Sequence, residues 1–258
     1  MSDLEVSLTL IGGPTVLLEI AGFRILTDPT FDPPSKYEAG GIVLEKTTGP
    51  ALTADEVGAI DLALVSHDQH FDNLDRSGRT FLTRAKTTCT TQMGATRLGQ
   101  GVVGLSPWET VTVEGRTGKQ LHVTATPARH GPAGFEPFSG DVVGFALGLD
   151  QPDDAIYVTG DTVWYDGVAE VAHRFSPRLV IAFAGSAKPR GPFRVTMDNN
   201  DAVETAHAFP HASIVIVHNQ GWTHFTESQA DAVRVFSMLG LTPRLQTLEP
   251  GKRVSIKI

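Results

Sequence analysis

The sequence predicts a layered α/β domain, in which stacked β-sheets are flanked by helices. Two observations favour this fold class. Short apolar or alternating segments separated by turns dominate the first half of the chain, as is typical of strands. In the second half, strand-like segments alternate with segments expected to be helical. The 258 residues, of which 41% are hydrophobic and 19% charged, are enough to bury a sizeable core.

The N-terminal third is expected to consist of strands joined by tight turns. Gly-Gly-Pro at residues 12–14 and Ala-Gly at residues 21–22 are turn signals between apolar or alternating segments. Residues 28–41 are rich in Pro and Gly, and we expect a long loop there. Residues 53–57 are expected to begin a short helix, with Thr53 as its N-cap. The strands expected in this part are residues 6–11, 15–20, 23–27 and the buried segment 61–66.

Strands and helices alternate in the remainder of the chain. Strands are expected at residues 102–105, 110–113, 121–125, 142–149, 155–158, 179–183, 213–217 and 253–258. Helices are expected at residues 92–98, 168–174, 200–208 and 227–239. No linker, repeat or change of composition divides the chain, so we expect a single domain over residues 1–258.

Composition and charge restrict the partners. The net charge is −8 and basic residues are scattered, which argues against nucleic acid as a partner. An anionic small substrate remains compatible, because bound metal cations would reverse the local field. The N-terminus MSDLEV lacks a signal-peptide pattern and no apolar run approaches the length of a membrane span, so we expect a soluble, cytoplasmic protein without a membrane partner. Cys89 is the single cysteine, so a metal site must use His, Asp or Glu.

Polar side chains with metal-binding capacity follow several of the predicted strands. The segment SHDQHFDNLD, residues 66–75, comes directly after a buried strand and is either a solvated loop or part of a metal site. Ligands drawn from separate strand ends are what a metal-hydrolase site requires, because the rigid sheet holds them in place. The candidates are His67, Asp68, His70, Asp72 and Asn73 in this segment and, at later strand ends, His130, Asp161 and His218.

These segments resemble the metallo-β-lactamase superfamily, whose signature is H-x-H-x-D-H, a downstream His, a bridging Asp and a final His. The resemblance is strongest to the branch that contains ascorbate-6-phosphate lactonase and N-acyl-phosphatidylethanolamine phospholipase D. It extends over about residues 8–225 through IGGPTVLLEIAGFRILTDPTF, HFDNLD, TATPARH, IYVTGDT and IVIVHNQGWTHF. It implies a four-layer αββα sandwich with the site at one edge of the two central sheets.

The resemblance carries over residue by residue, with two departures. The five positions that match ligands of the signature are His70, Asp72, His130, Asp161 and His218. Asn73 stands in place of the last His of H-x-H-x-D-H. Asp68 stands in the register of the first His, with His67 one residue earlier. The register favours Asp68 as the first ligand, and His67 is the other candidate, through a local bulge.

These departures bear on the metal. Asn73 offers only a neutral carbonyl oxygen, which is a weaker donor than imidazole. A carboxylate at the first position would favour harder ions, so we expect Zn²⁺ or Mn²⁺, with one or two ions per chain.

The implied activity is metal-assisted hydrolysis of a small ester, lactone or phosphodiester, with a metal-activated water. Asp72 is expected to orient that water or act as base. His224 either donates a proton or contacts substrate, or is a loop histidine packed on aromatic residues. Asp28 either holds a ligating histidine by a hydrogen bond or forms a plain Asp-Pro turn. Lys188, Arg190 and Arg194 contact an anionic group or belong to a solvated loop.

Two other functions are compatible with the sequence. One is a metal- or ligand-binding protein of the same fold with weak or lost turnover, which the departures at positions 68 and 73 suggest. The other is a nucleic-acid-processing enzyme of the superfamily, which the acidic net charge disfavours. An oligomer is compatible with either.

Overall fold

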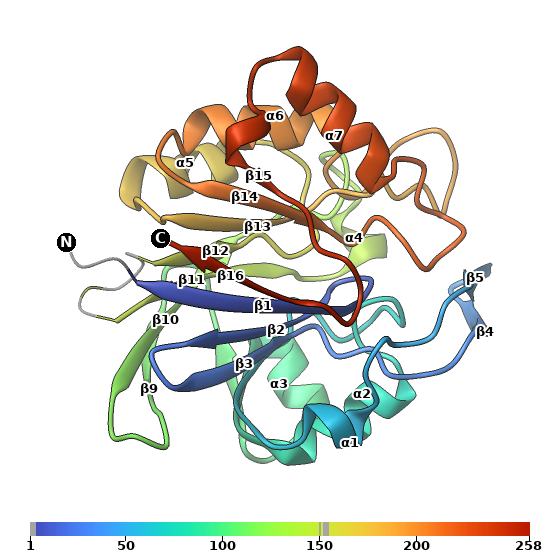
Figure 1. The fold of residues 1–258 in the computed structure, drawn as a ribbon. Coiled ribbons are helices and arrows are strands. Elements are labelled where there is room, and N and C mark those ends of the chain that lie inside the picture. Colours follow the sequence, from blue (N-terminus) through green and yellow to red (C-terminus); the bar gives the residue numbers. More distant parts are fainter. Residues whose placement is uncertain (1–3, 150, 152–154) are drawn as a thin grey trace.

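Two β-sheets face each other at the centre of the structure, and helices cover the outer face of each sheet (Figure 1). The computed structural model describes residues 4–149, 151 and 155–258. Residues 1–3 are part of the segment MSDLEV, on which the signal-peptide prediction was made, and they lie outside the described residues. The layers follow the order helix, sheet, sheet, helix, which confirms the predicted αββα sandwich (Figure 1).

The first sheet contains the N-terminal strands. In spatial order its strands in the described part of the chain are β16 (Arg253–Lys257), β1 (Glu5–Gly12), β2 (Thr15–Ile20), β3 (Phe23–Thr27), β6 (Ile60–Leu64), β7 (Ala85–Thr91) and β8 (Val102–Leu105). The neighbours from β3 to β8 pair in parallel, whereas the other pairs are antiparallel. β3 and β6 therefore end at the same edge of the sheet.

The second sheet is built from the C-terminal half. Its described strands, in spatial order, are β15 (Leu245–Gln246), β14 (Ser213–Val217), β13 (Leu179–Phe183), β12 (Ile156–Val158), β11 (Val143–Gly148), β10 (Gln120–Pro127) and β9 (Thr110–Glu114). β12 to β15 are parallel, and β9 to β12 pair antiparallel in succession. β10, β12 and β14 therefore run in the same direction, and their carboxyl ends share one edge.

Helices flank the sandwich on both sides (Figure 1). The first sheet is covered by α1 (Ala54–Val57), α2 (Arg76–Phe81) and α3 (Gln92–Leu98), and the second by α5 (Asp166–Arg174), α6 (Asn199–Ala208) and α7 (Gln229–Met238). Short helical turns are α4 (Glu136–Ser139), η1 (Leu82–Arg84) and η2 (Thr242–Arg244). Thr53 caps α1 as predicted, accepting a hydrogen bond from the amide of Glu56. None of the described helices is long and apolar enough to cross a membrane.

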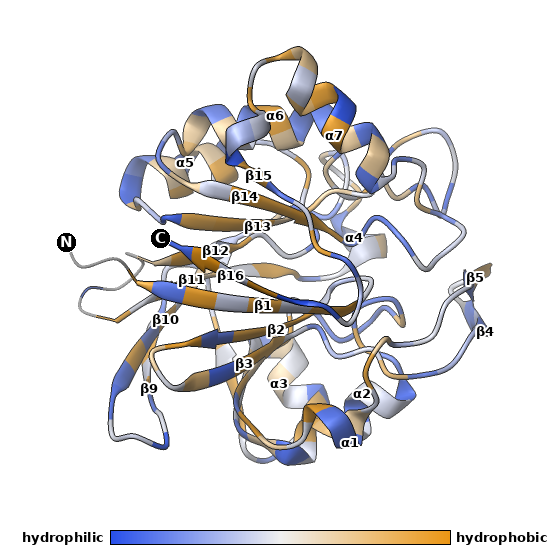
Figure 2. Cartoon of the chain, in the orientation of Figure 1, coloured by the Kyte–Doolittle hydropathy of each residue, from blue (hydrophilic) through white to orange (hydrophobic). Residues whose placement is uncertain are grey.

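The main core lies between the two sheets, where the strands carry mostly hydrophobic residues (Figure 2). Strand β13 packs against a different layer on each of its two faces. Leu179, Ile181 and Phe183 face the first sheet, whereas Val180 and Ala182 face α5 and α6. Both faces of β13 are therefore buried, which explains its uninterrupted apolar sequence.

The predicted loop at residues 28–41 is partly wrong, because its second half forms a hairpin. β4 (Ser35–Ala39) pairs antiparallel with β5 (Ile42–Lys46). The connection is Gly40-Gly41, and both glycines have positive φ angles, 54° and 82°. A two-residue hairpin turn with both central φ angles positive favours glycine at these positions. α2 and β7 were also absent from the prediction.

A buried ion pair fastens this hairpin to α2. Lys46 at the end of β5 lies 2.9 Å from a carboxylate oxygen of Asp75, and both side chains are buried. Asp75 is also the N-cap of α2, accepting from the amide of Gly78. Its two oxygens further accept from the amides of Phe31 and Asp32 at 2.9 and 2.7 Å. One carboxylate therefore joins three segments of the chain.

We expect Asp75→Ala to lower the free energy of unfolding by about 3–5 kcal/mol, because it leaves the buried ammonium of Lys46 without a counter-charge. Urea unfolding followed by circular dichroism measures this. Glu249→Ala is the matched control, since it removes an ion pair with Lys252 in which both side chains are exposed, and it should have a much smaller effect. Equal effects of the two substitutions would contradict the structural role of the buried pair.

Candidate metal centre

Six of the predicted ligands lie together where strands of the two sheets end. His67 follows β6 of the first sheet, while His130, Asp161 and His218 follow β10, β12 and β14 of the second. Strands that run in one direction deliver their following residues to one edge, so positions far apart in sequence meet there. The six side chains form two groups. The three-histidine group is His67, His70 and His130, and the mixed group is Asp72, Asp161 and His218.

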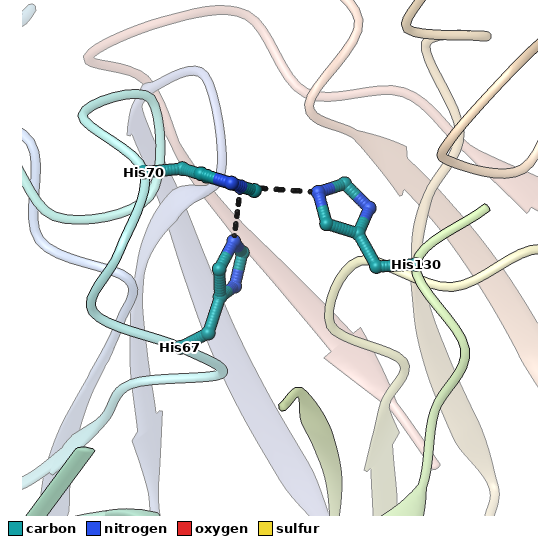
Figure 3. A group of neighbouring side chains, drawn as sticks. All are labelled: His67, His70 and His130. Atoms are coloured by element: carbon teal, nitrogen blue, oxygen red, sulfur yellow. Dashed lines mark hydrogen bonds between the residues drawn. The ribbon is translucent and has the colours of Figure 1, made fainter. Parts of the chain in front are cut away.

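The three-histidine group brings three ring nitrogens together (Figure 3). His67 Nε2 lies 2.9 Å from His70 Nδ1, and His130 Nε2 lies 3.1 Å from the same atom. The rings of His67 and His70 are nearly perpendicular, at 88°. His67 and His70 come from one loop and His130 from another, and the three side chains point toward one centre (Figure 3).

Hydrogen bonds fix which nitrogen of His67 faces this centre. The hydroxyl of Ser66 donates to Asp28 Oδ2 at 2.8 Å. Its oxygen therefore accepts from His67 Nδ1–H, 3.0 Å away. His67 Nε2 then carries no proton in the neutral ring, and its lone pair is directed at the centre.

His130 is arranged in the same way. Its Nδ1 donates to the carbonyl oxygen of Val195 at 2.7 Å, because a carbonyl can only accept. In the neutral ring His130 Nε2 therefore carries no proton, like His67 Nε2. A single proton on His70 Nδ1 can serve only one of these two neighbours at a time. Three converging nitrogens with at most one proton among them are the donor arrangement that a cation satisfies.

The pKa values of His67 and His70 are consistent with this donor arrangement. Burial and the neighbouring His130 lower the pKa of His70 to about 4. Burial and the neighbouring His70 also hold the pKa of His67 well below its usual range. Both rings are therefore neutral at pH 7, which is the form in which imidazole binds metals.

The mixed group lies beside the first group, and Asp161 contacts both. Asp161 Oδ1 is 3.3 Å from His218 Nε2, and Asp161 Oδ2 is 3.6 Å from His130 Nε2. Asp72 Oδ2 lies 3.7 Å from His218 Nε2. A carboxylate whose two oxygens face two groups of donors has the geometry of a bridging ligand.

Buried charge dominates the mixed group. Burial alone would raise the pKa of Asp72 and Asp161, but neighbouring histidines outweigh it and hold both pKa values below the usual range. For His218, burial opposes protonation, whereas the carboxylate of Asp161 outweighs it and raises the pKa. Among the described residues, Asp72 Oδ1, Asp161 Oδ2 and both ring nitrogens of His218 are buried without a hydrogen-bond partner. Orphaned donors and acceptors of these types fit a bound metal ion.

The two candidates for the first ligand position lie in different surroundings. The Asp68 carboxylate is in neither group and accepts from Arg97 Nε at 2.9 and 3.0 Å. Arg79 lies on its other side, 3.6 Å from Oδ2. Two guanidinium groups satisfy this carboxylate, and His67 takes the place in the three-histidine group. The residues that decide this, Arg79 and Arg97, lie too far along the chain for the local register to reveal them.

Asn73 faces the centre through its amide nitrogen. Its Nδ2 donates to Asp161 Oδ1 at 3.2 Å and to Asp28 Oδ2 at 3.3 Å. Its Oδ1 is buried without a hydrogen-bond partner in the described part of the chain. Asn73 therefore links two carboxylates instead of presenting an imidazole.

Asp28 acts on the centre through Ser66 rather than by a direct bond to a histidine. Its Oδ1 accepts from the amide of Ser66 at 2.6 Å, and its Oδ2 accepts from the hydroxyl. Burial raises the pKa of Asp28 to about 7, against the opposing effect of these hydrogen bonds. The backbone of Asp28 is left-handed, with φ at 30°. Both features cost free energy, so the surrounding hydrogen bonds must hold this residue in place.

A cavity of about 230 Å³ opens onto the centre. His70, Asp72 and His130 lie on its floor together with His224, whose Nε2 is 2.9 Å from Asp72 Oδ2. The sequence did not single out the apolar residues that line the cavity, because isolated hydrophobic residues in loops carry no periodic signal. They are Ile42, Leu44, Phe135, Phe138, Ala187, Pro189 and Val195.

Comparisons with known proteins indicate the family of the chain. A family model described as beta-lactamase superfamily domain matches residues 23–219. The UPF0173 protein YddR of Bacillus subtilis (strain 168) is 24% identical over 257 residues, which cover 95% of this chain and 98% of the relative.

Solved structures show the same fold. An isothiocyanate hydrolase from Delia radicum gut bacteria has a TM-score of 0.82 and 21% identity, covering 98% of this chain and 100% of the other. A possible metal-dependent hydrolase from Veillonella parvula DSM 2008 has a TM-score of 0.83 and 20% identity, covering 97% and 99%. Igni18, a metallo hydrolase from Ignicoccus hospitalis, has a TM-score of 0.73 and 19% identity, covering 98% and 99%.

We expect His67→Ala to weaken metal binding at least about tenfold, the scale found when even a hydrogen-bonding partner of a ligand is removed. Asp68→Asn is the matched control, and it should retain the metal because Asp68 is occupied by Arg97. Both variants are loaded with Zn²⁺ or Mn²⁺ and dialysed, and their metal content is then measured by elemental analysis. Loss of metal in Asp68→Asn but not in His67→Ala would reverse the assignment.

Proposed function

The chain belongs to the β-lactamase superfamily, and on that premise we propose that it is a metal-dependent hydrolase of a small ester, lactone or phosphodiester. One observation carries the proposal. Two groups of metal-capable side chains lie side by side, with Asp161 close to both, and His70, Asp72 and His130 of these groups line a cavity of about 230 Å³. The three structural neighbours, which are described as hydrolases, support it.

The two groups suit somewhat different ions. Three imidazoles at His67, His70 and His130 favour Zn²⁺, whereas two carboxylates and one imidazole at Asp72, Asp161 and His218 also accept Mn²⁺. When bound, such an ion polarises the scissile carbonyl or phosphoryl oxygen and lowers the pKa of coordinated water to roughly 7.

The residues of the chain hold and move the proton of the reaction. Hydrolysis adds a hydroxyl group to the electrophilic carbon or phosphorus and a proton to the leaving oxygen. Asp72 Oδ1 has no hydrogen-bond partner among the described residues and can accept a proton from the attacking water. The hydrogen bond from His224 Nε2 to Asp72 Oδ2 holds an imidazole beside it, in position to give a proton to the leaving oxygen.

Activity should be lost on dialysis against a chelator and should return with added Zn²⁺ or Mn²⁺.

Asp72→Asn should lower kcat by about 10²–10⁴-fold, because it removes the proton acceptor. His224→Gln should lower kcat while leaving metal content unchanged. Asp166→Asn, an exposed position at the start of α5, is the control for the same chemical change. A protein that carries no metal and stays silent on ester, lactone and phosphodiester panels would refute the proposal.

The alternative is a metal-binding protein with weak or lost turnover. Asn73 favours it, because its amide nitrogen faces Asp161 where the superfamily signature has a histidine. Asn73→His separates the two functions. If the native chain hydrolyses a panel substrate and Asn73→His brings no gain, the hydrolase proposal stands. Activity that only the variant has would favour the alternative.

A further inference from the structure

The cavity above the candidate metal centre has apolar walls. Ile42 and Leu44 come from the β4–β5 hairpin, Phe138 from α4, and Val195 from the loop before α6. Phe138 is 67% exposed, so its ring at the cavity is accessible to a ligand. An apolar cavity of about 150 Å³ already holds benzene. The 230 Å³ here is therefore sufficient for a phenyl-sized group and a few further atoms.

Arg190 supplies a positive charge to the same cavity. Its side chain lines the cavity and donates to the carbonyl oxygen of Gly40 at 2.8 Å. No carboxylate of the described residues forms an ion pair with it, unlike most arginines near the centre. The guanidinium of Arg190 therefore has N–H donors available to bind an anionic group of a small molecule in the cavity.

The other two basic residues of this loop do not serve the cavity. Arg194 is held by Asp198 at 3.1 Å and Asp201 at 2.8 Å. Lys188 is exposed and lines a different cavity. One guanidinium thus faces the cavity, which matches a singly charged carboxylate through its paired donors. No second lysine or arginine of the described residues lines the cavity to balance the further charge of a dianionic phosphate.

We propose that the substrate is a small ester or lactone that carries one compact apolar group, of about phenyl size, and one carboxylate that binds Arg190. The inference rests on the proposed function and names its substrate class. In the reaction the acyl–oxygen bond breaks, the water hydroxyl joins the acyl carbon, and the proton goes to the leaving oxygen. The substrate carboxylate is unchanged and serves only for binding.

The first test measures binding without turnover. The metal-loaded protein is titrated by calorimetry with 3-phenylpropionate, with its neutral amide and with phenyl phosphate. We expect 3-phenylpropionate to bind about tenfold or more tightly than the amide, and more tightly than phenyl phosphate. Arg190→Gln should remove this preference, whereas Lys188→Gln, the same charge change in the same loop, should keep it. Binding that is equal in the native chain and Arg190→Gln, as expected if the carboxylate only coordinates the metal, would overturn the proposal.

A second variant tests the apolar wall. Phe138→Ser changes an exposed side chain, so the fold is retained, and thermal unfolding checks this. It should weaken 3-phenylpropionate several-fold and leave propionate unchanged, since propionate lacks the phenyl group. An equal effect on both ligands would show that Phe138 does not contact the apolar group.

The closing experiment separates this inference from the proposed function. The substrates are the monophenyl ester of succinate, which keeps one carboxylate, and the neutral methyl phenyl ester. We expect kcat/KM to favour the acid about tenfold, mainly through KM, and Arg190→Gln to abolish the difference. Equal hydrolysis of both esters would overturn the inference and leave the hydrolase proposal intact. Arg190-dependent binding of 3-phenylpropionate with hydrolysis of neither ester would support the inference and count against the hydrolase.

Discussion

The burial of negative charge at the edge of the sandwich is the constraint on which the centre depends. Asp28, Asp72 and Asp161 are all nearly inaccessible to solvent. Transferring ionised carboxylates from water is costly unless other charges or hydrogen bonds compensate. In the described part of the chain, neither lysine nor arginine forms an ion pair with these three. The surrounding amides, hydroxyls and imidazoles compensate only in part, and a bound cation would balance the remaining charge.

Backbone strain at the strand ends adds to the free-energy cost of forming the centre. Asp28 after β3 and His218 after β14 both adopt left-handed conformations, with φ at 30° and 58°. Such conformations cost of the order of 1–3 kcal/mol each in residues other than glycine. The amide of His218 donates to the carbonyl of Gly13, which ties the end of one sheet to the turn of the other. The two sheets therefore position the side chains jointly, and neither would do so alone.

The layered fold was predictable, because strand periodicity and apolar runs are local properties of the sequence. β13 and β14 were recognisable from their composition alone, and His130, Asp161 and His218 from their places after strands. The choice between His67 and Asp68 was not, because it depends on Arg97, a residue 29 positions away along the chain. Arg190 was noted as a charge, but only the folded chain distinguishes it from Arg194, which is neutralised by acidic neighbours. Local patterns thus locate the centre, and long-range pairing decides its details.

The β4–β5 hairpin has different attachments at its two ends. At its base, Lys46 forms a buried ion pair with Asp75. At its tip, the carbonyl oxygen of Gly40 accepts a hydrogen bond from the exposed Arg190. Changes at the base would be selected against through folding, whereas changes at the tip would alter the cavity at little structural cost. Divergence among relatives should therefore accumulate at the tip. The tip of the hairpin is thus a part of the cavity wall that can vary in sequence while the candidate metal centre stays unchanged.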